Sequence, residues 1–259
     1  MEAQKPLILV TNDDGIFAKG IRTLVEEMTA LGEVWIIAPD SPQSGMGHAV
    51  TIRDILRVDE VAYDVPGVRA FACSGTPVDC VKLAIYRVLD RRPDLLVSGI
   101  NHGANSSINV IYSGTMSAAV EGAIEGIPSI GYSLLDFAAD ANFDPGRKSI
   151  TAIAKNVLAH GLPKGTCLNV NIPKLPENEL NGIKICRQAN GYWADAFDLR
   201  VDPNGHTYYW MTGKFENPDR GEDTDEWALA HGYVSVVPTQ CDLTNHLLIG
   251  PLNQWEFEL

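Results

Sequence analysis

The stretch LILVTNDDGIF, Leu7 to Phe17, joins a continuous apolar run directly to two adjacent carboxylates. Leu7–Thr11 has the length and composition of a buried strand, and Gly20–Leu31 has the apolar spacing of the helix that follows. Asp13 and Asp14 stand between them, where a single acidic residue would be enough to cap a turn. The second carboxylate adds charge repulsion, which a bound divalent cation would convert into affinity.

The alternation of apolar runs and helical patterns continues to residue 172. Strands are expected at 34–38, 95–97, 129–132 and 167–172, and helices at 81–89, 117–125 and 149–160. Apolar strands that alternate with helices predict an α/β fold with a doubly wound, mostly parallel sheet covered on both faces. In such sheets ligands bind beyond the carboxyl ends of the strands, which is where Asp13 and Asp14 are expected.

The composition is that of a globular protein, and its charge restricts the partners. Of the 259 residues, 45% are hydrophobic and 20% are charged, and the net charge of −13 disfavours nucleic-acid duplexes and anionic membranes as partners. No apolar run approaches the roughly 18 residues that a membrane helix needs. The five cysteines are scattered and no N-terminal signal segment is evident, so we expect free thiols and a cytoplasmic location.

Two further loops and a helix start are expected at the same edge of the sheet. The loops Asp40–Thr51 and Ser98–Ser107 follow presumed strands and offer hydroxyl and amide oxygens, which suit Mg²⁺ or Mn²⁺ better than zinc. Ser113, Gly114 and Thr115 open an alanine-rich helix, whose free N–H groups would form a phosphate cradle. The alternative for this tripeptide is an ordinary helix cap.

The C-terminal part of the chain predicts an extended hairpin. Residues 195–213 contain two β-rich runs around Asn204-Gly205, a hairpin turn signal. The runs are too apolar for a lone solvated arm, so they pack either on the core or, as we expect, on a second subunit in a homodimer or homotetramer. We divide the chain into a catalytic domain (1–185), an arm with a short helix (186–230), and a returning strand with the tail (231–259).

Six blocks of the sequence, taken in order, resemble the stationary-phase survival protein SurE family of metal-dependent 5′-nucleotidases. They are TNDDG (11–15), APDSPQSG (38–45), SGTPVDCV (74–81), SGINHGAN (98–105), YSGT with AAVEG (112–122), and GYVSVVP with DLT (232–244). Each block alone is a weak signal. The ordered set is specific and extends over most of the chain.

The resemblance implies a fold, an activity and a set of site residues. The implied fold is a Rossmann-like domain with a second region that carries an extended hairpin used in oligomers. The implied activity is hydrolysis of nucleoside 5′-monophosphates, with 3′-monophosphates or polyphosphate as further substrates of some members. The tail after Asp242 is short, which argues against a long C-terminal helix exchanged between subunits. Carried over to this chain, one divalent metal is held by Asp13, Asp14, Ser44 and Asn101, and the substrate or its phosphate is bound by Asn12, Gly45, Asn105, Ser113, Gly114 and Thr115.

The expected mechanism is attack of a metal-activated water on phosphorus. Either Asp13 or Asp14 would orient or deprotonate that water, and the sequence does not choose between them. His48 is a candidate acid for the leaving group, although a loop histidine is more often simply solvated.

Three other functions compete with this one. An aspartyl-phosphate phosphatase separates its two acidic residues by one position, whereas here they are contiguous. A dinucleotide-dependent oxidoreductase needs a G-x-G-x-x-G motif, which residues 11–20 lack. A metal-dependent nucleotide sensor without turnover stays open as the alternative.

Overall fold

A single large sheet organises the molecule in the computed structural model, which describes residues 5–257. Among these residues nine strands stand in the order β3-β4-β2-β1-β5-β6-β7-β11-β8. The strands are β1 (Leu7–Thr11), β2 (Glu33–Pro39), β3 (Val58–Val61), β4 (Arg69–Cys73), β5 (Leu95–His102), β6 (Ser129–Leu134), β7 (Thr166–Ile172), β8 (Ile183–Ile185) and β11 (Val234–Gln240). From β4 to β7 every neighbouring pair is parallel, whereas β3 and β11 run antiparallel to β4 and β7. The predicted α/β class with a mostly parallel sheet is confirmed.

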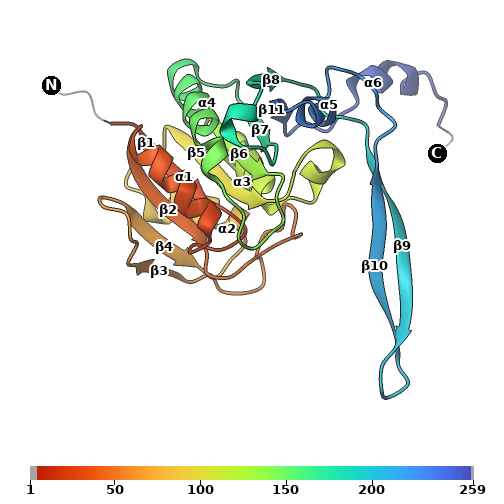
Figure 1. The fold of residues 1–259 in the computed structure, drawn as a ribbon, viewed down its shortest axis with the longest axis horizontal. Helices are drawn as coiled ribbons and strands as arrows, with labels where there is room; N and C mark the ends of the chain where they lie inside the picture. Colours follow the sequence, from red (N-terminus) through yellow and green to blue (C-terminus); the bar gives the residue numbers. More distant parts are fainter. Residues whose placement is uncertain (1–4, 258–259) are drawn as a thin grey trace.

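Helices cover both faces of this sheet (Figure 1). On one face α1 (Lys19–Thr29) packs beside α4 (Arg147–His160), and on the other α2 (Pro77–Leu83) packs beside α3 (Gly114–Ile124). The side chains of β1 alternate between the two layers, because successive residues of a strand point to opposite faces. Ile8 and Val10 lie in the α1 and α4 layer, and Leu7 and Leu9 lie in the α2 layer. All five residues of β1 are buried, which explains its unbroken apolar sequence.

The parallel strands bring their carboxyl ends to one edge. Val10 of β1 is in register with Ile36 of β2 and Val97 of β5, so the segments that follow these strands leave the sheet together. The loop after β2, the end of β5 and the segment after β6 therefore surround Asp13 and Asp14. This edge is where the functional site is expected.

A long hairpin, which we call the arm, leaves the body of the molecule (Figure 1). It consists of β9 (Tyr192–Val201) and β10 (Thr207–Glu216), paired antiparallel, and nearly all of its residues are exposed. The predicted C-terminal hairpin is confirmed, and it extends further toward both ends than 195–213. Its apolar side chains do not pack on the core of this chain.

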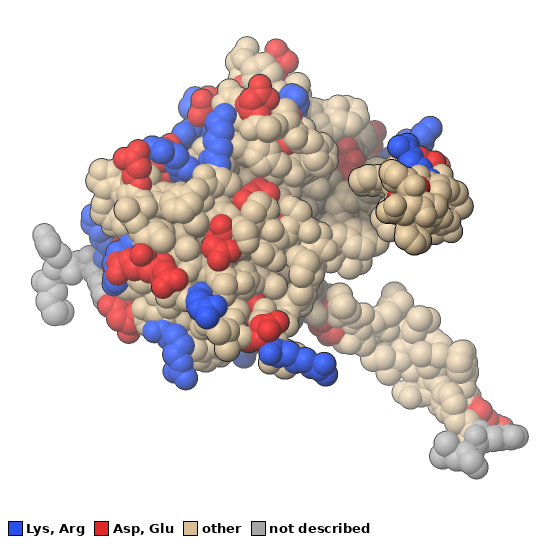
Figure 2. Space-filling view, turned by 90° about the horizontal axis from the view of Figure 1, so that it is seen from below, with Lys and Arg blue, Asp and Glu red and all other residues tan. Residues whose placement is uncertain are grey.

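The chain returns to the main sheet after the arm. A short helix, α5 (Asp225–Ala230), leads into β11, which is inserted between β7 and β8. The returning strand of the region 231–259 thus belongs to the same sheet as the region 1–185. After β11 the chain forms a helix of seven residues, α6 (His246–Leu252). The C-terminal segment that contains α6 projects from the body and carries almost no charged side chains (Figure 2). Residues 1–4 and 258–259 of the predicted regions lie outside the described residues.

No helix within residues 5–257 is long and apolar enough to cross a membrane. All five cysteines are free thiols, as expected, and four of them are buried.

Candidate active site

A pocket of about 300 Å³ opens at the carboxyl edge of the sheet. It receives residues from the segments after β1, β2 and β6, from the end of β5, and from the loop between β5 and α3. Its lining consists of Asp13, Asp14, Ser44, Gly45, Asn101, His102, Ala104, Asn105, Asn109, Tyr112, Ser113 and Phe137. The four residues expected to hold a metal are all among them.

Asp13 is a buried residue of the pocket wall. Its side chain is only 4% exposed, and its Oδ1 accepts a hydrogen bond from the Thr115 hydroxyl on α3. Burial raises its pKa to about 6, because a carboxylate away from water is costly, and the bond from Thr115 partly opposes this shift. The backbone carbonyl of Asp13 also accepts from the Gln43 N–H at 2.7 Å, which fastens the loop that carries Ser44.

Asp14 and Asn101 each leave an oxygen without a partner from the protein. Asp14 Oδ2 is buried without a hydrogen-bond partner, and burial raises the pKa of this carboxyl as well. The Asn101 amino group donates to the carbonyls of His102 at 3.1 Å and Gly103 at 2.9 Å, so its Oδ1 is the atom left for a ligand. An unpartnered buried carboxylate oxygen is costly, and a cation would satisfy it.

The donor set suits a hard divalent cation. Asp13, Asp14, Ser44 and Asn101 offer only oxygen ligands, the type preferred by Mg²⁺ and Mn²⁺. Within residues 5–257 no group of three or more His, Cys, Asp or Glu side chains is arranged to hold a metal, so the nitrogen and sulfur ligands of a zinc centre are not gathered in this part of the chain.

The start of α3 forms one wall of the pocket. The Ser113 hydroxyl caps the helix by accepting from the Met116 N–H at 3.0 Å. Gly114 lies so close to Asp13 that an added Cβ would stand 2.7 Å from the Asp13 Cβ. Thr115 is fully buried and its hydroxyl is committed to Asp13, so its side chain positions a carboxylate and does not face a phosphate. The ordinary helix cap is thus present at Ser113, and the phosphate cradle stays a prediction.

The predicted site residues Asn12 and Asn105 differ in their position relative to the pocket. Asn12 is 1% exposed, does not line the pocket, and donates from Nδ2 to the Gly15 carbonyl at 2.9 Å, which closes the turn after β1. Asn105 does line the pocket, and its Nδ2 donates to the Ser133 hydroxyl at 2.8 Å. The Asn105 N–H donates to Asn171 Oδ1 at 2.7 Å, so β6 and β7 support this residue from below.

His48 contacts a buried carboxylate of α3. Its Nε2 lies 2.9 Å from a carboxylate oxygen of Glu121, a buried residue of α3 that also pairs with Lys82. His48 is not part of the pocket lining. This contact ties the loop after β2 to α3, and the role of His48 as a leaving-group acid stays a prediction.

Sequence reasoning missed five lining residues: His102, Ala104, Asn109, Tyr112 and Phe137. His102 is the last residue of β5, and Ala104, Asn109 and Tyr112 belong to the segment between β5 and α3, of which only the part up to Ser107 was expected at the site as a loop. His102 stacks edge-on against Phe143, with the ring centroids 5.0 Å apart. Phe137 follows the carboxyl end of β6, and the edge rule that located Asp13 would also have pointed to it.

Comparisons with known proteins agree with this architecture. The family model described as "Survival protein SurE" matches residues 8–195. A protein of Christiangramia forsetii named 5′-nucleotidase SurE is 63% identical over 256 residues, which cover 98% of each chain, and one of the same name from Cytophaga hutchinsonii is 61% identical over 98% of each chain. The crystal structure of the SurE protein from Aquifex aeolicus superimposes with a TM-score of 0.82 at 39% identity, covering 96% of this chain and 98% of the other. The chain therefore belongs to the SurE family.

Proposed function

We propose that this protein is a 5′-nucleotidase that hydrolyses nucleoside 5′-monophosphates to nucleoside and phosphate with the help of one divalent cation. The observation that carries the proposal is the pair of adjacent carboxylates, one of them with a buried and unpartnered oxygen, beside a capped helix start in one pocket. The names of the relatives, 5′-nucleotidase SurE, support the reaction type.

The cation would be held by Asp13, Asp14, Ser44 and Asn101. When bound, Mg²⁺ or Mn²⁺ would polarise a phosphoryl oxygen and acidify a water. Asp13 or Asp14 would orient that water or accept its proton for attack in line with the leaving ribose oxygen. The N–H groups at the start of α3 and of Gly45 would stabilise the charge on the phosphoryl oxygens. Nucleoside 3′-monophosphates and polyphosphate are further candidate substrates, and the proposed location is the cytoplasm.

The test is a phosphate-release assay over a panel of nucleoside monophosphates and polyphosphate, with Mg²⁺, Mn²⁺ or chelator. We expect release with a cation and none with chelator. Asp13→Asn and Asp14→Asn should each remove most of the rate, because each loses half of the carboxylate charge at the site. Full activity of metal-free protein, or of both folded variants, would exclude this mechanism. Tight nucleotide binding without release of phosphate would favour the sensor alternative.

We also propose that the arm joins subunits into a homodimer or homotetramer. Two-stranded hairpins are marginal in water, and this arm exposes Phe197, Leu199, Tyr209, Trp210 and Met211 by 57% or more. Such side chains are expected to be covered by a second copy, most simply about a two-fold axis. Light scattering should show at least a dimer, and deletion of residues 197–211 should give a smaller species with a folded sheet. A monomer at micromolar concentration would contradict the proposal.

A further inference from the structure

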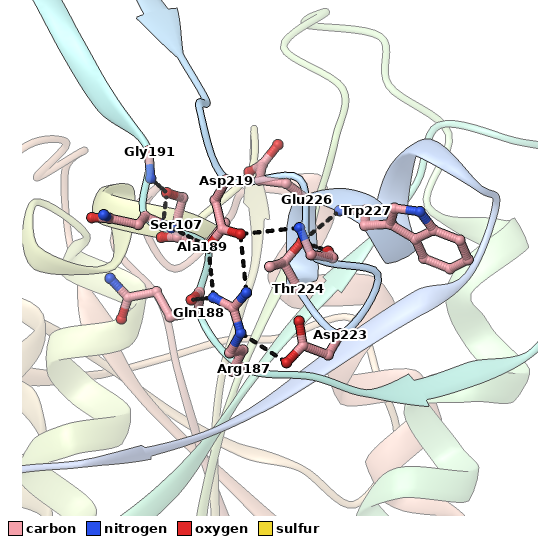
Figure 3. Close-up of polar contacts among 12 residues, drawn as sticks. Ser107, Arg187, Gln188, Ala189, Gly191, Asp219, Asp223, Thr224, Glu226 and Trp227 are labelled. Carbon is pink, nitrogen blue, oxygen red and sulfur yellow. Dashed lines mark hydrogen bonds and ion pairs between the residues drawn. The ribbon is translucent and has the colours of Figure 1, made fainter.

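The arm is joined to the active-site loop at its base by hydrogen bonds. Ser107 lies in the loop between β5 and α3, and its hydroxyl accepts from the Gly191 N–H at 3.0 Å and donates to the Ala189 carbonyl at 2.9 Å. The Ser107 N–H donates at 2.8 Å to Asp225, whose other oxygen accepts from the Ala189 N–H at 2.9 Å. Figure 3 shows Gly191 pointing at Ser107, with Arg187 between Asp219 and Asp223 nearby.

One residue of the arm contacts the lining of the pocket directly. Trp193, the second residue of β9, donates from its indole Nε1 to Asn109 Oδ1 at 2.8 Å. The indole is fixed by an edge-on contact with Phe215 of β10, at 5.8 Å between ring centroids. The Phe215 ring in turn fills the space beside Gly191, where an added Cβ would stand 2.5 Å away. Although Trp193 is 43% exposed, its contacts with Phe215 and Asn109 hold the indole on the pocket side of the arm base.

This contact determines which end of the Asn109 side chain is available to a ligand. An indole N–H is a donor only, so the atom of Asn109 that it meets must be the carbonyl oxygen. The amino group of Asn109, a donor of two hydrogen bonds, is then the polar end left for the pocket that Asn109 lines. Without the indole, the Asn109 amide could turn and point its oxygen into the pocket. That oxygen would repel an acceptor oxygen of the substrate.

We propose that Trp193 is a positioning residue of the active site, which orients Asn109 so that its amino group donates to an oxygen of the ribose of the bound nucleotide. The N–H of Tyr112 donates to the Asn109 carbonyl at 3.1 Å, so Asn109 stands one tight turn before Ser113 and the start of α3. In a nucleoside monophosphate the ribose adjoins the phosphate. A donor one turn away from the phosphate cradle is therefore within the part of the pocket that the sugar would occupy.

The inference rests on the proposed nucleotidase function and is tested with three single variants and one double variant of the full chain. Trp193→Phe removes the N–H and keeps an aromatic ring against Phe215. Asn109→Ala removes the amide. Trp210→Phe is the matched control, because this tryptophan stands further along the arm and its indole makes no hydrogen bond within residues 5–257.

Phosphate release from one nucleoside monophosphate with Mn²⁺ is measured for each variant, together with the mass in solution and the melting temperature. Trp193→Phe should raise KM about twofold to tenfold, the worth of one hydrogen bond, with kcat changed less than about twofold. Asn109→Ala should raise KM at least as much, and the double variant should be no worse than Asn109→Ala, because Trp193 acts through Asn109. Trp210→Phe should leave KM unchanged.

An unchanged KM in Trp193→Phe would overturn the inference, and so would a Trp193→Phe effect that persists in full in the Asn109→Ala background. Failure of the proposed function has a different signature. The unmodified protein would then release no phosphate. The dissociation constant of the nucleotide, measured by calorimetry for the same four variants, would then replace KM, and the same order of effects would be expected.

Discussion

Replacing Asp225 by asparagine tests whether a buried carboxylate holds the base of the arm to the pocket wall. Asp225 is fully buried. Its Oδ2 accepts from the Ser107 N–H at 2.8 Å, and its Oδ1 accepts from the N–H groups of Ala189 at 2.9 Å and Glu226 at 2.8 Å. An asparagine amide has one acceptor oxygen. In either orientation of the amide, its amino group would therefore face at least one of these N–H groups.

The magnitude follows from these contacts. Loss of a hydrogen bond to a charged group costs about 1.5–3 kcal/mol, and a buried N–H left without a partner adds about 1–3 kcal/mol. Removal of the buried charge offsets part of this cost, because burial already raises the pKa of the Asp225 carboxyl. We expect a net loss of about 2–4 kcal/mol, which lowers the melting temperature of a protein of this size by roughly 5–10 °C.

The neighbouring carboxylate provides a matched control. Glu226 is bonded through one oxygen only, by the Ser106 hydroxyl, and a glutamine can offer that oxygen unchanged. Glu226→Gln should therefore cost less than about 1 kcal/mol. Both variants are compared with the unmodified protein by thermal unfolding followed by circular dichroism, in chelator so that no cation contributes. Equal melting temperatures for Asp225→Asn and the unmodified protein would refute the role of the carboxylate as a structural anchor.

The remaining predictions concern the proposed metal site and the base of the arm. Thr115→Val should weaken Mn²⁺ binding, measured by calorimetry, by about tenfold, because it removes the bond that orients Asp13. Ser44→Ala should weaken Mn²⁺ binding and leave the melting temperature of metal-free protein unchanged, since Ser44 is exposed; a lower melting temperature would show that Ser44 is a structural residue. Arg187 holds the pKa of Asp219 well below its ordinary value of 3.8, so the stability that this ion pair supplies is present above that value and is lost as the pH falls below it. Asp219→Asn should accordingly lower the melting temperature at pH 7 and approach the unmodified protein in acid; a gap independent of pH would contradict this origin.

Apolar periodicity predicted the central strands of the sheet and the helices that cover it. The strand predicted at residues 7–11 coincides with β1. All five of its residues are buried, so the continuous apolar run marks the strand clearly. The helix predicted at 81–89 begins earlier, at Pro77, after a capping box in which Thr76 and Asp79 bond each other's backbone. That signal was present in the sequence SGTPVD. Strands β3, β4 and β8 were not predicted. Two of the four residues of β3 are exposed and acidic, and β8 has only three residues, two of them exposed.

Sequence reasoning identified which segments reach the site and was less able to say which way their side chains turn. Asn12 and Asp13 are neighbours, yet one closes a turn beneath the pocket and the other lines it. The contact of Trp193 with Asn109 joins residues that are 84 positions apart in the sequence, so no local sequence pattern predicts it. Such contacts depend on the tertiary packing of the arm base against the loop after β5, which periodicity does not encode.

The charges in the pocket explain why phosphate and cation should bind together. The ionisable side chains of the lining are Asp13, Asp14, His102 and Tyr112, so the two carboxylates face an incoming phosphate that is itself an anion. Burial raises the pKa of both carboxyls, a sign that each is costly to ionise while it lacks a positive partner. A divalent cation would offset that cost and would make the electrostatic potential at the phosphate position positive. The start of α3 would add a smaller positive potential. Inorganic phosphate should therefore bind measurably tighter in the presence of Mn²⁺ than in chelator, and Mn²⁺ should bind tighter by the same factor when phosphate is present, as thermodynamic linkage requires.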